Sequence, residues 1–186
     1  MLRAPRGRRR RTRQAPPFVA VALSFLLFLL LPHAVVSAGV QADAVVARTN
    51  IVRDAHARPL LRSDDALTIA AQRRAEELAS GSYFDHVRPD GAPFSTAVAD
   101  ARYPFERVAE NLAVDYLTVT PLMDGWMESA SHRQSILNGT YADIGVGVAT
   151  GIVRGIPTIV TVQLLGRTKP PELRGWVRTT SALGMG

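Results

Sequence analysis

Residues 144–148 read Ile-Gly-Val-Gly-Val, so that large apolar side chains alternate with glycine. A period of two is typical of a β-strand that turns all its large side chains toward one face of a sheet. The glycines leave the other face flat, which permits close approach by a helix or by a ligand. The run therefore predicts a strand with one packed face and one flat face.

A second strand is predicted a short distance downstream. Residues 159–165 (IVTVQLL) are apolar except for Thr161 and Gln163, which predicts a strand buried on both faces apart from these two positions. The connection over residues 149–157 contains two glycines, as hairpin loops commonly do. We therefore expect the two strands to be antiparallel neighbours.

Two helices are predicted upstream of these strands. Residues 44–56 form the first, which ends before Pro59, and residues 64–79 form the stronger second, with an acidic start and a Ser-Gly end. In that second helix Glu76 and Glu77 are interpreted as solvated surface residues. Its apolar stripe follows helical spacing and consists of Leu67, Ala70, Ala71, Arg74/Ala75 and Leu78.

Residues 82–116 show no regular period and contain a Pro-Asp-Gly turn signal and further prolines. They are predicted to form a long irregular loop, and such loops are often functional in compact domains. A third helix is expected to begin at Thr120, with Pro121 in its first turn. Its inner face would consist of Leu122, Met123, Trp126 and Ala130. Together these elements predict one α/β domain.

The charge of the chain is concentrated at its N-terminus. The 186 residues carry a net charge of +6, but seven arginines lie among the first thirteen residues, and without them 15 basic residues face 16 acidic ones. A nearly neutral body offers no basic groove, so nucleic acid is not expected as a partner. The absence of cysteine excludes a disulfide framework, a thiolate nucleophile and a thiolate metal site.

An apolar run at residues 18–31 follows the arginines. As a helix, its fourteen residues would rise about 21 Å, short of the roughly 30 Å hydrocarbon core of a bilayer. We therefore expect residues 1–38 to be a signal peptide, cleaved after Ala38 or after Ala44, with an uncleaved membrane anchor as the alternative. Either form places the body outside the cytoplasm, with membrane contact only through this segment. Residues 167–186 are expected to be a flexible tail.

Few side chains could carry chemistry. His86 and His132 lie in polar sequence, and Glu110-Asn111 lies between them, flanked by apolar residues. A carboxylate in such surroundings needs a partner, because burying it unpaired would cost several kcal/mol. From spacing alone, these residues could equally be satisfied structural groups.

The order of these elements is similar to that of the CAP superfamily (the SCP or PR-1-like domain) in its compact bacterial form. The resemblance covers residues 44–166, and no single piece of it is specific, whereas the ordered set is. The matching pieces are Asn50-x-x-Arg53, Pro59-Leu60, Leu67-x-x-Ala70-Ala71, Phe84-Asp85-His86, Ala109-Glu110-Asn111, Trp126-x-x-Ser129-x-x-His132-Arg133, residues 144–148 and Gln163-Leu164-Leu165-Gly166.

This resemblance implies a three-layer α-β-α sandwich with a small, mainly antiparallel sheet, and a cleft near a tetrad of two histidines and two acids. His86, His132 and Glu110 match three members of the tetrad, and Asn111 follows the acid directly. The fourth position, acidic in many relatives, is Ser129 here. Glu128 lies one residue earlier, which on a helix turns it about 100° away.

Three uses of such a triad remain open. His86 and His132 could hold zinc or another divalent metal, with Glu110 orienting one ring, although two protein ligands would bind weakly. Ser129 or Ser131 could act as a nucleophile with His132 as base and Glu110 as its orienter. In the third, Glu110 accepts hydrogen bonds from both rings and has a structural role.

We expect an exported domain with a non-enzymatic cleft for a ligand, and the family resemblance suggests a lipid, cell-envelope or protein ligand. The alternative is an extracytoplasmic metal-dependent or serine hydrolase of peptides or esters. The resemblance alone does not choose between them, because one fold hosts many functions.

Overall fold

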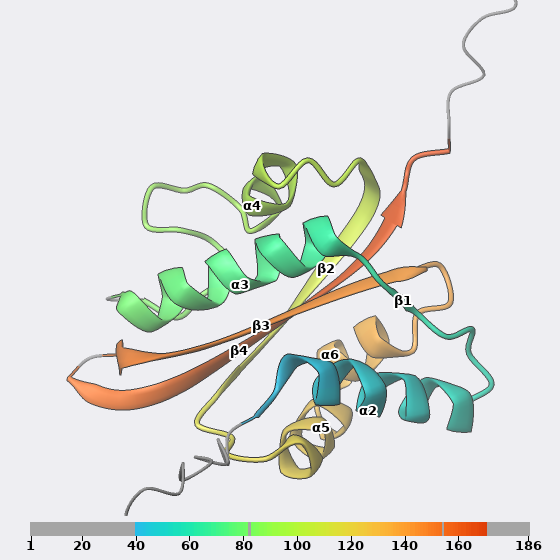
Figure 1. Ribbon diagram of the computed structural model, residues 1–186, viewed down its shortest axis with the longest axis horizontal. Helices are drawn as coiled ribbons and strands as arrows, with labels where there is room; N and C mark the ends of the chain where they lie inside the picture. The colour runs from blue at the N-terminus through green and yellow to red at the C-terminus, as the bar shows by residue number, and fades with distance from the viewer. Residues whose placement is uncertain (1–39, 82, 154, 171–186) are drawn as a thin grey trace, which may run out of the picture. The chain divides into compact units, whose positions relative to one another are not determined.

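The computed structural model describes residues 40–81, 83–153 and 155–170, all of which belong to one unit of the chain. Helices cover both faces of a four-stranded sheet, as Figure 1 shows. The expected N-terminal signal or anchor, and the tail from residue 171 onward, lie outside the described residues. Within those residues, no helix combines the length and the apolar character needed to cross a membrane.

The sheet has the strand order β1-β3-β4-β2, which places β2 at one edge. The long strands β2, β3 and β4 are antiparallel neighbours, and only the short β1 pairs in parallel, with β3. This is the predicted small, mainly antiparallel sheet. Its strands are β1 (Arg62–Ser63), β2 (Phe105–Val114), β3 (Asp143–Val153) and β4 (Ile156–Thr168).

Five helices form the outer layers within the described residues. Two of them, α3 and α4, lie on one face of the sheet, and α2, α5 and α6 lie on the other (Figure 1). The predicted acidic start of α3 is confirmed, because Asp64 caps the helix by accepting the Leu67 N–H at 2.9 Å. The helices are α2 (Ala42–Ala55), α3 (Asp65–Ser80), α4 (Ser95–Asp100), α5 (Val119–Glu128) and α6 (Ala130–Ile136).

The flat face of β3 is filled by a helix. A Cβ added to Gly145 would lie 2.2 Å from the carbonyl carbon of Leu67, and one added to Gly147 would lie 2.3 Å from that of Ala71. Both neighbouring atoms are main-chain atoms of α3. Of the two occupants that the glycines permit, helix or ligand, the structure therefore shows the helix.

Alternation along the strands separates the core into two clusters. On the α3 face, the apolar side of α3 packs against Leu112, Val160, Val162 and Leu164. On the other face, α2, α5 and α6 pack against Ala113, Ile144, Val146 and Leu165. Neighbouring residues of β2 thus point into different layers, which decides where Glu110 and Asn111 go.

Several expectations need correction. The stretch 82–116 is not one long loop, because it contains α4 and all of β2. The hairpin loop is much shorter than residues 149–157, since β3 runs to Val153 and β4 starts at Ile156. Thr161 and Gln163 are buried, not exposed positions of β4. Each strand is longer than its apolar run because ladder hydrogen bonds, rather than side chains, extend it.

The third helix also differs from the prediction. It starts at Val119 with Thr118 as its N-cap and stops at Glu128. Ser129 has an extended main chain (φ −76°, ψ 124°), which separates α5 from α6. Ala130 consequently belongs to α6 and is exposed, whereas Leu122, Met123 and Trp126 are buried as expected.

Candidate functional site

Glu110 is the buried centre of the candidate site. Its side chain has no exposed surface, and Arg74 of α3, equally buried, donates from Nε to Glu110 Oε1 at 3.0 Å. Burial raises the pKa of Glu110, whereas Arg74 and His86 act to lower it. For Arg74, burial acts to lower the pKa, but the contacts with Glu110 and Tyr83 outweigh it and raise the pKa. Arg74 is therefore the partner that this carboxylate needs.

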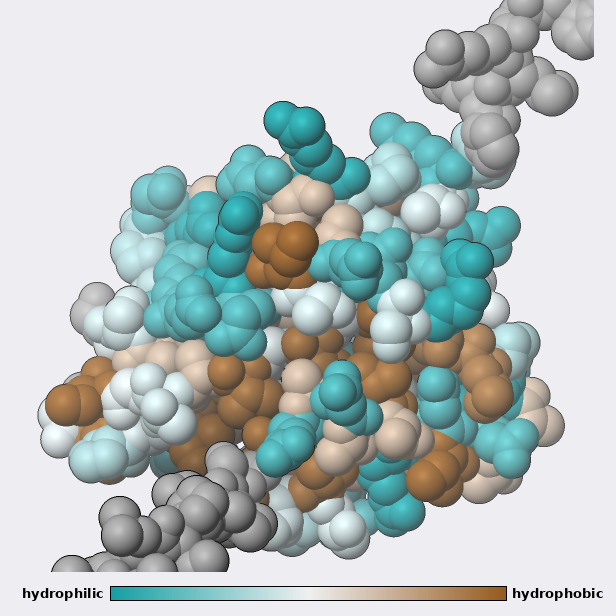
Figure 2. Space-filling model, viewed as in Figure 1, coloured by the Kyte–Doolittle hydropathy of each residue, from teal (hydrophilic) through white to brown (hydrophobic). Residues whose placement is uncertain are grey.

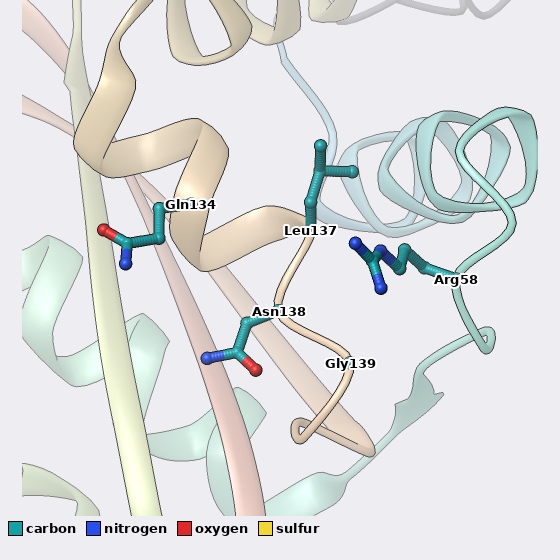
Figure 3. Close-up of a pocket in the computed structure, with 5 residues that line it drawn as sticks. All are labelled: Arg58, Gln134, Leu137, Asn138 and Gly139. Carbon is teal, nitrogen blue, oxygen red and sulfur yellow. The ribbon is translucent and has the colours of Figure 1, made fainter.

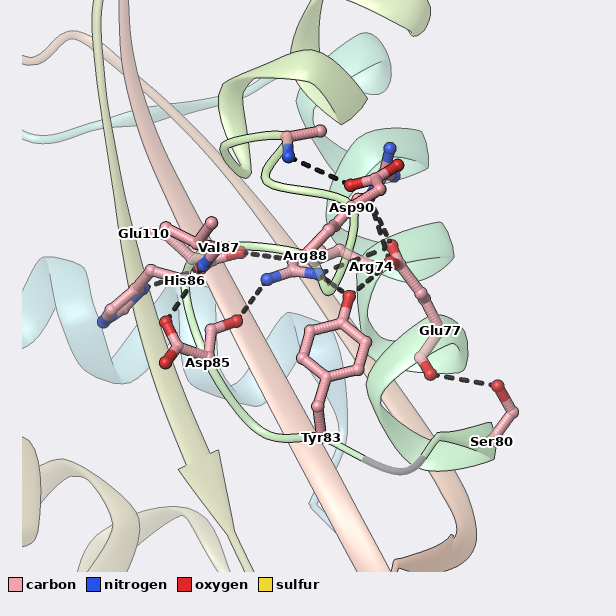
Figure 4. A network of polar contacts seen from close by, with 11 residues as sticks. Arg74, Glu77, Ser80, Tyr83, Asp85, His86, Val87, Arg88, Asp90 and Glu110 are labelled. Atoms are coloured by element: carbon pink, nitrogen blue, oxygen red, sulfur yellow. Dashed lines mark hydrogen bonds and ion pairs between the residues drawn. The ribbon is translucent and has the colours of Figure 1, made fainter.

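His86 contacts the second oxygen of the same carboxylate. Its Nδ1 lies 2.8 Å from Glu110 Oε2, and its side chain is 51% exposed. Because an ionised carboxylate only accepts hydrogen bonds, Nδ1 carries a proton, and in the neutral form of the ring Nε2 is then an acceptor. Arg74 also donates from Nη2 to the main-chain oxygen of Asp85, which fixes the loop that presents His86 (Figure 4). The structure thus brings His86 and Glu110 into direct contact, as predicted. The arginine that holds both the carboxylate and the loop of His86 was not predicted.

A second carboxylate extends this network. Glu77 accepts hydrogen bonds from the Tyr83 hydroxyl and from Arg88, and Arg74 contacts both Glu77 and Tyr83 (Figure 4). The interpretation of Glu77 as a solvated surface residue is wrong, since its side chain is 28% exposed and is held by these three partners. The place of Arg74 in an apolar helical stripe was the signal that could have indicated a buried arginine in need of an acid.

His132 lies on α6, across the edge strand from His86. Its Nδ1 is buried and has no hydrogen-bond partner among the described residues. Burial, and to a smaller extent the charge of nearby His86, lowers the pKa of His132, so the ring is neutral at pH 7. Of the three uses left open, the one in which Glu110 accepts hydrogen bonds from both rings is therefore not what the structure shows, because its two oxygens contact Arg74 and His86.

The two serines do not form a catalytic relay in the described structure. Ser129 Oγ lies 3.2 Å from Ser131 Oγ, and neither hydroxyl has a histidine among its hydrogen-bond partners. Ser131 lies inside α6, since the helix begins at Ala130. Glu128 is exposed at the end of α5, which agrees with its expected direction away from the site.

Asn111 points away from Glu110, into the opposite layer. Its Nδ2 donates to Gln163 Oε1 at 2.8 Å, and Gln163 donates in turn to Thr49 of α2. Asn111 is 1% exposed, and its Oδ1 has no partner among the described residues. The structure therefore places Asn111 in a buried amide chain under α2 and does not bring it to His86.

The donor set for a metal ion is small. Within the described residues, no three histidine, aspartate or glutamate side chains are grouped so that they could share an ion. Nδ1 of His86 is engaged by Glu110, which leaves Nε2 to act as a ligand. His86 and His132 would thus supply two imidazoles, one ligand fewer than catalytic zinc sites usually have.

Two pockets lined by described residues lie elsewhere. One, of about 380 Å³, lies beside the C-terminal end of α6 and is lined by Arg58, Gln134, Leu137, Asn138 and Gly139 (Figure 3). The other, of about 390 Å³, lies beside the β3–β4 hairpin and includes Leu117, Pro157 and Ile159. Figure 2 shows hydrophilic side chains gathered over α3 and α4, on the same side of the sheet as Glu110.

Two bacterial proteins match the sequence. The chain is 31% identical over 125 residues to the uncharacterized protein YkwD of Bacillus subtilis, which is 66% of this chain and 46% of that protein. It is 29% identical over 100 residues to the uncharacterized membrane protein YlbC of the same organism, 54% of this chain and 29% of that one. The chain therefore spans less than half the length of these relatives.

The fold matches a solved structure as well. An extracellular protein of Bacillus anthracis that contains an SCP domain superposes with a TM-score of 0.60 at 24% identity, over 68% of this chain and 40% of that one. The model of the CAP, or cysteine-rich secretory protein, family matches residues 46–163, which include every residue of the candidate site. Although it has no cysteine, this chain belongs to the CAP family.

Proposed function

We propose that this protein is an exported, non-enzymatic binding domain whose ligand binds in the region around His86, Glu110 and His132. The observation that carries the proposal is the state of Glu110, whose two oxygens are both engaged, one by Arg74 and the other by His86. A carboxylate held in this way is not available as an acid or base, but it fixes the ring of His86 with its outer edge half exposed. Such an arrangement presents a fixed polar group for recognition.

Export of the domain is part of the proposal. The arginine-rich start and the apolar run at residues 18–31 support it, together with the extracellular relative of Bacillus anthracis. Val40 is 6% exposed and packs with Leu122 and Met123, so cleavage after Ala44 would remove a core residue. We therefore expect N-terminal sequencing of the exported product to begin at Gly39. A first residue at position 45 would contradict this expectation.

The ligand class is tested by NMR on the chain starting at Gly39. The ligands added to the protein are phospholipid micelles, soluble peptidoglycan fragments and synthetic peptides. A ligand of the site shifts the ring signals of His86 and His132, and His86→Ala weakens binding at least tenfold. His56→Ala is the matched control, because His56 is exposed at the end of α2 and bonds only to its own helix. An equal loss of ligand affinity in His86→Ala and His56→Ala would contradict the proposal.

The competing function is hydrolysis of peptides or esters, by a serine or with a metal. Ser129 and Ser131 contact each other and not His132, which favours binding over serine catalysis. Incubation of the purified protein with a broad panel of peptides and esters distinguishes the two functions. Turnover that is abolished by His132→Ala and kept by His56→Ala would establish the enzyme and overturn the proposal.

A weakly held divalent metal is compatible with the same site. The contact of Nδ1 with Glu110 leaves Nε2 of His86 directed outward, and His132 supplies a second imidazole, which its lowered pKa keeps neutral at pH 7. Calorimetric titration of zinc into the wild type and into His86→Ala tests this feature. Saturable zinc binding that His86→Ala removes would support the metal site. Because two protein ligands bind weakly, the titration extends to about 1 mM zinc, and the absence of saturable binding up to that concentration would refute the site.

A further inference from the structure

The edge strand β2 separates the two histidines of the site. β2 pairs with β4 on one side only, so its other side ends the sheet. Glu110 and its partner His86 lie on the α3 face of this strand, whereas His132 belongs to the α5–α6 layer on the opposite face. The free side of β2 therefore runs between His86 and His132.

The register of β2 shows which main-chain groups face this free side. The Asp115 N–H donates to the Ile159 oxygen at 2.8 Å, so this pair is hydrogen-bonded. In an antiparallel ladder such pairs alternate, and the residues between them direct their N–H and C=O away from the partner strand. Counting back from Asp115 along the continuous register shows that the main-chain N–H and C=O groups of Val108, Glu110 and Leu112 face away from β4.

A second contact supports the same assignment. Trp126 Nε1 donates to the main-chain oxygen of Leu112 at 3.1 Å from outside the ladder. That oxygen can accept this bond only if it points away from β4. The two observations agree on the orientation at the C-terminal end of this segment, and the continuous register extends it back to Val108.

The outward groups of Val108 and Glu110 have no other partner. No hydrogen bond from the rest of the described chain reaches their main-chain N–H or C=O. Glu110 as a whole is 7% exposed although its side chain is fully buried, so the exposed atoms belong to its main chain. An unpaired edge of this kind is a ready template for another strand.

The usual protection of edge strands is confined to the start of β2. The bulge between Phe105 and Arg107, the preceding Pro104 and the exposed charges of Glu106 and Arg107 all lie there. Between Val108 and Leu112 the only charged side chain is Glu110, which is buried and neutralised by Arg74. This segment is thus open to pairing where it passes between the histidines.

We propose that the ligand of this site is an extended peptide segment that adds as a fifth strand along Val108–Leu112. The inference rests on the proposed binding function and names its partner class. The N–H and C=O of Val108 and Glu110, with the Leu112 N–H, offer up to five main-chain hydrogen bonds to four or five peptide residues. Alternate peptide side chains then face His86 and His132, which select the sequence.

The free protein provides the first test, by amide hydrogen exchange measured with NMR on the chain from Gly39. The amides of Val108 and Glu110 should exchange at least a hundredfold faster than those of Ala109 and Asn111, which bond to β4. Slow exchange at all four amides would show that the edge is already covered and would overturn the proposal.

Binding is tested with a bead-bound library of random hexapeptides and the variant Val108→Pro. Proline removes the outward N–H and spares the ladder, because its nitrogen does not face β4. Val108→Ala, which keeps the N–H, is the matched control. Peptides selected on the wild type should bind Val108→Pro at least tenfold more weakly and Val108→Ala nearly normally. Retained protection of the Ala109 and Asn111 amides shows that Val108→Pro still folds.

The outcomes separate this inference from the proposed function. N-methylation at alternate peptide nitrogens should abolish binding, whereas methylation of the intervening nitrogens should not. Peptides that bind equally to Val108→Pro overturn strand addition. If no hexapeptide binds while a lipid or glycan shifts the ring signals of His86, the inference fails and the proposed function survives.

Discussion

Two fully buried arginines hold two regions of this molecule together in different ways. Arg53 of α2 donates to the main-chain oxygens of Pro59, Ile136 and Asn138, at 2.7, 2.6 and 3.0 Å. Arg74 of α3 instead forms an ion pair with the carboxylate of Glu110. Burial, reinforced by Arg58, lowers the pKa of Arg53, while the neighbouring acid raises that of Arg74.

The difference separates a structural role from a role at the site. Carbonyl groups cannot change charge, so the surroundings of Arg53 form a fixed clamp on the chain after α6. A carboxylate can gain a proton and can position a histidine, and the surroundings of Arg74 do the second through Glu110. The same residue type with the same burial thus serves packing in one layer and the candidate site in the other.

The largest effect is expected for Arg53→Met. This substitution removes the donor of these three carbonyl oxygens and also of the Tyr141 oxygen, which Arg53 reaches at 3.5 Å. We expect the free energy of unfolding to fall by about 3–5 kcal/mol. Urea denaturation followed by circular dichroism measures it. The exposed neighbour Arg58 provides the control Arg58→Met, which should be nearly neutral. A loss below about 1 kcal/mol would mean that water replaces the guanidinium easily.

Arg74→Met should cost about 2–4 kcal/mol, because the buried Oε1 of Glu110 loses its ionic partner and only the contact with His86 remains. The effect should be partly reversed in Arg74→Met/Glu110→Gln, with a coupling energy of about 1–3 kcal/mol in a double-mutant cycle. No substitution of an acid can rescue Arg53 in this way, which sharpens the contrast between the two arginines. Arg73→Met, on the exposed side of α3, is the control. Strict additivity in the cycle would refute the pairing.

His132 adds a third case, a half-buried base whose buried Nδ1 has no partner among the described residues. Its folded-state pKa lies below the unfolded value of 6.5, so the unfolded chain binds the proton more readily. The free energy of unfolding should therefore fall as the pH drops below 6.5, and this fall should end once the pH is below the folded-state pKa. His132→Gln should flatten this fall and His56→Gln should not, as measured by urea denaturation at several pH values. An unchanged slope in His132→Gln would contradict the prediction.

The smallest effect is expected for Glu77→Gln. Burial acts to raise the pKa of Glu77, but bonds from Tyr83 and Arg88 outweigh it, so the folded-state pKa lies below the unfolded 4.5. Glu77 then stabilises the protein above pH 4.5, and the contribution disappears as the pH falls through the folded-state pKa. We expect Glu77→Gln to lose less than about 1 kcal/mol at pH 7 and nothing at low pH. Glu76→Gln, on the exposed side, should show neither effect.

The sequence predicted those elements whose signal is local. The helix α3 followed from its apolar period, and the strand β3 from its alternating glycines. β2 was missed because its residues 105–111 mix charged, amide and apolar side chains, as an edge strand that holds side chains in ion pairs does. Its existence depends on pairing with β4, which no property of residues 105–114 themselves reveals.

The site was predicted in its members but not in its contacts. His86, Glu110 and His132 were found from their order, but none of the three uses left open included Arg74, which contacts Glu110 together with His86. An arginine within an apolar helical stripe indicates a buried acid nearby but does not say which acid. Only the packing of α3 on the sheet, which brings residues 74 and 110 together, supplies that information.

The bare contact between α3 and β3 has a consequence for how a ligand binds. Side chains at an ordinary helix–sheet interface can change rotamer and absorb a small displacement of the helix. At Gly145 and Gly147 the main chain of β3 packs directly against the main chain of α3, so no side chain is present to absorb a displacement. The helix that carries Arg74 has little freedom to shift, and the entropy of ordering Glu110 and His86 is lost on folding rather than on binding. A partner should therefore meet a preformed surface, associate without a slow conformational step and leave the spacing of the site unchanged.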